Sequence, residues 1–149
     1  MIILGKTFIC ISMGLIFVAY MNFVPTAFRS ELIADYVKNH FVREIVFGLG
    51  IAVFTIRSVL SASSLSQLRL VTVFGSIIVW PFWIASWLGW STGGLSDVWG
   101  GRIDPSAAYL LHGSQALLFV FGLAILALAL RSRLKDEKDA PAVETWWSF

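Results

Sequence analysis

Charged side chains are scarce in this chain. Asp, Glu, Lys and Arg make up only 13% of its 149 residues, whereas hydrophobic residues make up 58%. Soluble domains carry about 25% charged and about 45–50% apolar residues, so the composition excludes an ordinary soluble domain. The net charge is only +2 and the basic residues form no patch, which gives no reason to expect a nucleic-acid partner.

Cysteine is also scarce, and the usual groupings of catalytic side chains are missing. The one cysteine, Cys10, lies inside an apolar run, so no internal disulfide can form and a small buried hydrophobe is expected there. No nucleophile–base pair, paired-carboxylate site or Glu-x-x-His metal motif can be assembled. The one enzyme-like grouping would be a meeting of Glu44, Asp104 and His112 at a membrane surface. An enzyme is less favoured than a non-catalytic protein, and the question stays open.

Long apolar runs are abundant, and the mean hydropathy is +0.81. Runs of about 20 apolar residues are long enough to cross a bilayer as helices, and here they are continuous rather than alternating. The sequence therefore predicts an all-α integral membrane protein, a four-transmembrane-helix bundle forming one domain over 1–130, with a polar tail over 131–149. The four spans are expected at about 7–24, 41–60, 70–90 and 106–130.

The connections between the spans are polar. Pro25 is expected to end the first span, which continues too far for a cleaved signal peptide. Apolar residues at helical spacing between 25 and 40 favour a short interfacial amphipathic helix between spans 1 and 2, with an ordinary connecting loop as the alternative. A serine-rich turn over 61–69 joins the second and third spans. Asp104 and Pro105 have the residue types of an N-cap and a first helical position for the fourth span.

The distribution of lysine and arginine predicts the orientation in the membrane. Four spans place both termini and the turn over 61–69 on one side. The basic residues on that side are Lys6, Arg57, Arg69, Arg131, Arg133, Lys135 and Lys138. Those on the other side are fewer: Arg29, Lys38, Arg43 and Arg102. By the positive-inside rule both termini are expected in the cytoplasm, with a bacterial inner membrane as the expected location.

The third span carries a row of tryptophans. Trp80, Trp83, Trp87 and Trp90 fall within a sector of about 80° on an ideal helix. Trp90 lies near the interface, where tryptophan is common, but Trp80 is about 15 Å deeper at 1.5 Å per residue. A row that reaches the bilayer centre needs an apolar or π-rich surface to pack on. That surface would be another helix, another subunit, or a lipophilic ligand.

Further tryptophans and the charges of the second span complete the candidate contact sites. The tryptophans outside the third span are Trp99, Trp146 and Trp147. The charged candidates within the membrane are Arg43, Glu44 and Arg57. A charge within a span is a functional candidate by default, but near the ends of a span a long side chain can reach the headgroups instead. Both interpretations stay open.

The fourth span carries a polar pair suited to a cofactor. His112 and Gln115 are three residues apart, on one helix face with Phe119 and Gly122. With His40, His112 could ligate haem, a metal or a chlorophyll magnesium. The alternative is a histidine whose hydrogen bonds are satisfied at the interface. The cofactor class to consider is therefore a lipophilic molecule, such as a quinone, carotenoid, chlorophyll or haem.

The size and four-span layout are similar to those of DoxX-like proteins and of membrane-bound glutathione transferases, which are small four-helix bundles. The resemblance covers layout and no specific motif. The second span also lacks the Arg/Asn/Glu pattern that the glutathione transferases use for glutathione. The resemblance therefore implies the fold alone, because layout does not carry function.

Together these features predict a non-catalytic subunit or assembly partner of a larger membrane complex, of respiratory, photosynthetic or similar kind. The expected partners are the lipid bilayer and other membrane subunits, or further copies of the same chain. A binder or redox handler of a lipophilic small molecule is the alternative. A small transporter is less favoured, because few polar groups lie at mid-depth.

Overall fold

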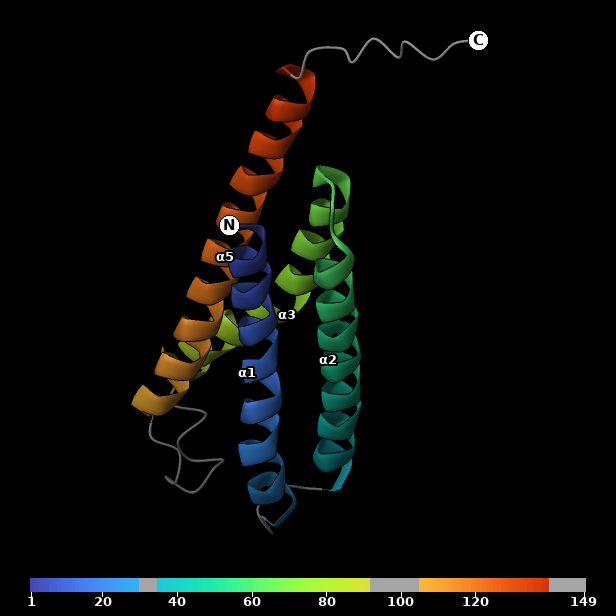
Figure 1. Ribbon diagram of the computed structural model, residues 1–149. Coiled ribbons are helices and arrows are strands. Elements are labelled where there is room, and N and C mark those ends of the chain that lie inside the picture. The colour runs from blue at the N-terminus through green and yellow to red at the C-terminus, as the bar shows by residue number, and fades with distance from the viewer. Residues whose placement is uncertain (30–34, 92–104, 140–149) are drawn as a thin grey trace.

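The computed structural model describes the backbone of residues 1–29, 35–91 and 105–139. Side chains are described for 1–19, 21, 38–40, 42–81, 83–84 and 110–135. Within these residues the chain is all helical (Figure 1). The helices are α1 (Ile2–Arg29), α2 (Asp35–Ser61), α3 (Leu65–Ser91) and α5 (Pro105–Asp139).

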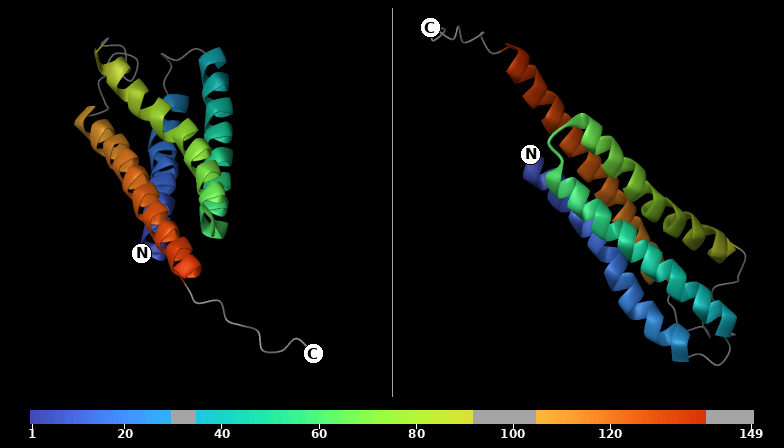
Figure 2. Two further views of the ribbon diagram at one scale, coloured as in Figure 1. Left: turned by 90° about the horizontal axis from the view of Figure 1, so that it is seen from above. Right: turned by 90° about the vertical axis from the view of Figure 1, so that its right-hand side faces the viewer.

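The four helices pack as a ring of antiparallel neighbours. α1 lies between α2 and α5, and α3 lies between the same two helices on the other side. Each helix runs opposite to the one before it (Figure 1 and Figure 2). The most extensive packing joins α1 to α5, the first and last helices of the sequence. The first and last helices therefore close the ring.

The distribution of side chains is that of a protein in lipid. Large apolar residues lie on the outside: Phe47 of α2 is 67% exposed and Leu110 of α5 is 71% exposed. Polar side chains are found inside, among them Ser12, Thr55 and Gln115. Among the described residues, three stretches are long and apolar enough to cross a membrane, namely Ile2–Ala19, Lys38–Ser61 and Leu110–Lys135. The apolar part of α3 that is described, Leu65–Pro81, is shorter.

The helices are longer than the predicted spans, and this corrects two expectations about the first connection. α1 continues through Pro25 to Arg29 instead of ending at the proline. A proline removes only one backbone donor, which a long helix can tolerate within a membrane. The predicted interfacial helix is not a separate element. Its beginning belongs to α1, its end from Asp35 belongs to α2, and residues 30–34 lie outside the described part.

The turn between α2 and α3 is much shorter than the serine-rich segment suggested. Only residues 62–64 separate the two helices. The hydroxyl of Ser64 accepts a hydrogen bond from the backbone N–H of Gln67, at 3.3 Å, as an N-cap does. The Gln67 side chain in turn accepts from the backbone N–H of Ser63, at 2.7 Å. This reciprocal capping allows α3 to begin at Leu65, five residues before its predicted start.

Replacing Ser64 with alanine is expected to lower the free energy of unfolding by about 1 kcal/mol, because an N–H group at the start of α3 loses its acceptor. The change can be measured by circular dichroism during unfolding in mixed detergent micelles. Ser66→Ala is the matched control. Its hydroxyl contacts that of Ser64 at 2.9 Å but does not cap the helix, so a change of only a few tenths of a kcal/mol is expected. Equal losses in the two variants would contradict the capping role.

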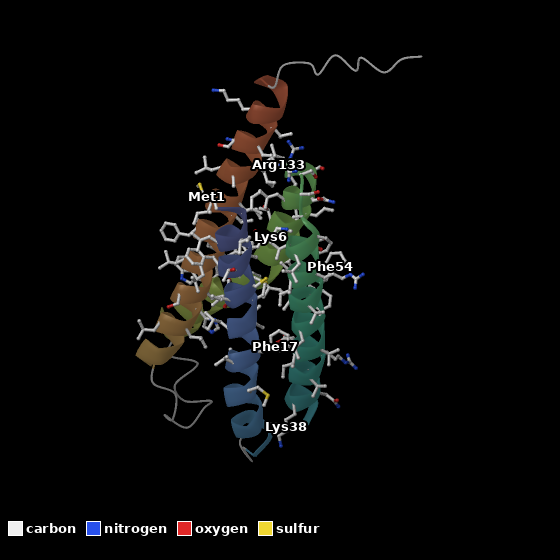
Figure 3. All side chains as sticks on the ribbon, in the orientation of Figure 1. Met1, Lys6, Phe17, Lys38, Phe54 and Arg133 are labelled. Carbon is white, nitrogen blue, oxygen red and sulfur yellow. The ribbon has the colours of Figure 1, made fainter. Side chains whose placement is uncertain are left out.

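A second capping contact links α1 to the end of α2. The ammonium group of Lys6 donates a hydrogen bond of 2.7 Å to the backbone carbonyl of Leu60 (Figure 3). The last carbonyls of a helix have no partner within that helix, and the negative end of the helix dipole favours a cation there. Between α2 and α3, the ring of Phe54, which is 48% exposed, meets that of Phe74 edge to face at 4.7 Å.

Glycines set the distances between the other helix pairs. A side chain on Gly122 of α5 would meet the backbone of Gly5 and Ile9 on α1, and one on Gly5 would meet the backbone of Leu126. α1 and α5 therefore cross with their backbones in close approach, as small residues allow in membrane bundles. On the other side of α5, the ring of Phe119 occupies the space beside Gly75 of α3.

α5 begins at Pro105, as the sequence predicts, whereas Asp104 lies outside the described residues. The helix does not end at 130, the predicted boundary of the span. It continues through the first charged residues of the predicted tail to Asp139. In Figure 1 this end of α5 extends beyond the start of α1.

Candidate functional site

A cluster of polar side chains is buried between α1 and α5. Ser12 comes from α1, and His112 and Gln115 come from the N-terminal part of α5. Their exposed fractions are 0%, 7% and 2%. The face of α5 that carries His112 and Gln115 is buried, because Phe119 and Gly122 also lie inside. The role of His112 and Gln115 in binding a cofactor stays a prediction.

Two hydrogen bonds organise this cluster. The hydroxyl of Ser12 donates to the backbone carbonyl of Gln115 at 2.8 Å, and so joins positions 103 residues apart in sequence. The Nδ1 atom of His112 lies 3.4 Å from Oε1 of Gln115. An amide oxygen can only accept, so in this arrangement the hydrogen is on Nδ1.

The amide nitrogen of Gln115 is the unusual atom of the site. Nε2 is buried and has no hydrogen-bond partner among the described residues. A primary amide carries two N–H donors, and buried donors are nearly always paired. Leaving one unpaired in an apolar environment costs several kcal/mol as an order of magnitude. The site therefore presents a hydrogen-bond donor with nothing in the described chain to accept from it.

The packing of α1 on α5 fixes the position of this donor. Gly5 lies against Gly122, and Ser12 lies against Gln115. The step is seven residues along each helix, in opposite directions, which corresponds to about two turns of an α-helix. The glycine crossing thus holds the register that brings the Ser12 hydroxyl to the Gln115 carbonyl.

The predicted tryptophan row is only partly within the described side chains. Trp80 is 37% exposed, whereas Trp83 is half-buried and packs against the apolar core. Their rings contact each other edge to face, with centroids 6.1 Å apart. One ring therefore faces outward and its neighbour faces inward. The remaining predicted contact residues lie outside the described side chains: Trp87, Trp90, Trp99, Trp146 and Trp147.

The predicted intramembrane charges lie on the outside of α2. Arg43, Glu44 and Arg57 are all exposed. Glu44 lies 3.8 Å from His40, which is also exposed and lies one turn away. The buried His112 belongs instead to the packing of α5 against α1. No group of three metal-binding side chains occurs in the described part of the chain.

Sequence reasoning missed Ser12 and Gly5, although Ser12 lies in the predicted first span and Gly5 lies just before it. A serine within an apolar helix commonly bonds to its own backbone, and no pattern in the sequence indicates a partner in the last helix. The seven-residue spacing of Gly5 and Ser12 repeats in Gly122 and Gln115 with the opposite direction. That mirrored spacing is the one signal available, and it becomes meaningful only after α1 and α5 are paired.

No family model, curated protein or solved structure matches this chain. Its possible functions therefore have to be argued from its own residues and their packing.

Proposed function

We propose that the protein is a four-span integral membrane protein that serves as a non-catalytic subunit or assembly partner of a membrane complex. The observation that carries the proposal is that the side chain of Trp80, in the middle of α3, is partly exposed on the outside of the bundle. Trp83 beside it is half-buried, so the pair joins the core of the bundle to its outer surface. Aromatic side chains of this kind are common anchors of protein interfaces.

The length of α3 supports a fourth membrane crossing. Its 27 residues would extend about 40 Å, more than the ~30 Å thickness of the hydrocarbon layer. α3 also packs against α2 and α5, each of which contains a candidate span. A helix packed between two helices that each contain a candidate span is expected to cross the membrane with them.

The placement of basic residues supports cytoplasmic termini. Lys6 at the start of α1 and Arg133 near the end of α5 lie toward the same end of the bundle (Figure 3). Arg69 and the α2–α3 turn belong to that end as well, since α2 finishes there. The positive-inside rule assigns such an end to the cytoplasm.

Trp80 favours a protein partner over lipid alone. Tryptophan in membrane proteins is most common at the interfaces, where its N–H can reach water or headgroups. Trp80 is sixteen positions into α3 and its neighbour along the helix is Pro81. A ring exposed at this depth is better accommodated against the surface of another protein.

Replacing Trp80 with alanine is the direct test. We expect the wild-type protein, solubilised gently from its native membrane, to retain stoichiometric partner polypeptides in native mass spectrometry. W80A should lose them while keeping its own helical content, with only a small drop in melting temperature from the lost edge-to-face contact with Trp83, because 37% of Trp80 is exposed. Phe47→Ala removes a more exposed aromatic ring from α2, 67% exposed against 37% for Trp80, and should retain the partners. The proposal would be contradicted if the wild-type preparation contained a single kind of polypeptide and the W80A assembly had the same mass.

A binder of a lipophilic small molecule is the second candidate, favoured by the unpaired amide nitrogen of Gln115. A transporter receives less support from the same bundle. The hydroxyl of Thr55 donates to the carbonyl of Ile51, and that of Thr72 donates to the carbonyl of Leu68. Both threonines are thus engaged within their own helices and offer little to a passing solute.

A further inference from the structure

We infer that the cluster of Ser12, His112 and Gln115 binds the carbonyl oxygen of an uncharged lipophilic molecule, with Nε2 of Gln115 as the hydrogen-bond donor. The inference goes beyond the proposed role as a subunit and does not depend on it. A partner protein would contact the outside of the bundle, whereas this site lies inside it.

The hydrogen bonds already present determine what the ligand must offer. The backbone carbonyl of Gln115 accepts from Ser12, and its side-chain oxygen faces Nδ1 of His112. Both oxygens of Gln115 therefore have a partner, and the group without one is the N–H donor of Nε2. A donor is satisfied only by an acceptor, so the ligand must bring an oxygen or nitrogen with a free lone pair.

The charge of the surroundings determines the class of ligand. The buried polar side chains of the described residues are those of Ser12, Thr55, His112 and Gln115, and none of them is a carboxylate, lysine or arginine. An ionic ligand would remain unpaired in this environment, at a much larger cost than that of the amide. A neutral carbonyl oxygen meets the requirement of the donor without adding charge.

The depth of the site requires the rest of the ligand to be lipophilic. Gln115 is ten residues from the start of α5 at Pro105, or about 15 Å along the helix. Ser12 is ten residues from the start of α1 at Ile2, or about 15 Å. A molecule that reaches this depth from the bilayer needs an apolar body. Quinone rings and glycerolipid esters both carry carbonyl groups of the required kind.

Infrared spectroscopy of a labelled carbonyl tests the inference. The full-length protein is placed in phosphatidylcholine nanodiscs with decylubiquinone carrying ¹³C at its ring carbonyls, and in a parallel sample with ¹³C-labelled ester carbonyls in the lipid. A hydrogen bond lowers the C=O stretching frequency of the bound population. We expect a shifted, saturable band in one of the two samples, which also identifies the source of the carbonyl.

The variant Gln115→Leu removes the donor while keeping an apolar side chain of similar size. We expect the shifted band to disappear and the affinity to fall about tenfold, the effect of losing one hydrogen bond. The melting temperature without ligand should stay the same or rise, because an unpaired buried amide has been removed. Thr55→Val is the control. It removes a buried hydroxyl that bonds within its own helix, and it should leave the band in place.

Other outcomes overturn the inference. They are the absence of a shifted band in both wild-type samples, and a band that Q115L leaves unchanged. A large loss of stability in Q115L without any band in the wild type would show that the amide serves the fold alone. If Q115L does not fold, Gln115→Met and the wild-type spectra decide. Partner loss in W80A is measured separately, so the two proposals can fail independently.

Discussion

Replacing Phe119 with alanine is expected to lower the free energy of unfolding by about 3–5 kcal/mol, the usual cost of emptying the space of a buried aromatic ring. The ring is only 1% exposed and is the largest of the fully buried side chains in the described part of the chain. It fills the space between α5 and α3 beside Gly75. Lipid cannot replace these contacts, because packing rather than water exclusion holds helices together in a membrane.

The pairing of Phe119 with Gly75 gives this prediction a specific signature. A Cβ atom at position 75 would overlap Cε2 and Cζ of the ring, so Gly75→Ala should also be destabilising. Phe119→Leu shortens the side chain at that point. The double variant should therefore be more stable than the sum of the two single changes predicts, and the double-mutant cycle measures the difference. Simple additivity would show that the ring does not lie against Gly75.

Gly122→Ala is expected to lower the free energy of unfolding by about 1–3 kcal/mol, because added volume in a tightly packed contact forces the backbones apart. The new Cβ atom would lie 2.6 Å from Cγ1 of Ile9 and 3.0 Å from both the Gly5 carbonyl oxygen and the Ile9 nitrogen. The Ile9 side chain could rotate away. The two backbone atoms could not, so α1 would have to move as a whole.

Gly113→Ala is the control for this substitution on the same helix. A Cβ atom there meets nothing within 4 Å. Its stability should therefore stay the same or rise, by up to about 1 kcal/mol, since alanine favours the helix over glycine. Unfolding in mixed micelles gives both values. Similar losses at positions 113 and 122 would mean that the effect comes from helix propensity and that α1 does not closely approach α5.

The membrane character of this chain could be predicted because it depends on composition and on continuous apolar runs. Each predicted span lies within a helix of the structure. The ends of the helices were predicted less well. Pro25 looks like a stop signal in the sequence, but the loss of one donor does not end a helix whose neighbours remain apolar. Conversely, serines that suggested a loop begin α3, because Ser64 and Gln67 cap it.

Only part of the candidate site could be predicted from the sequence. The spacing of His112 and Gln115 showed that they share a helix face, and the structure buries that face. Their partner Ser12 could not be found, because it comes from the opposite end of the chain and depends on the register of α1 on α5. The unpaired state of the amide nitrogen depends on the same register. Interactions of this kind are absent from local sequence patterns.

The length of α5 has a consequence for whatever meets the protein outside the membrane. Its 35 residues rise about 52 Å, well beyond the ~30 Å of hydrocarbon that the helix has to cross. Leu130 is still buried in the bundle, and the exposed Arg131 follows at once. From there to Asp139 the helix extends for about another 13 Å. Its height and rotational angle are set by residue count, so each added residue would lift an attached group by about 1.5 Å and turn it by about 100°.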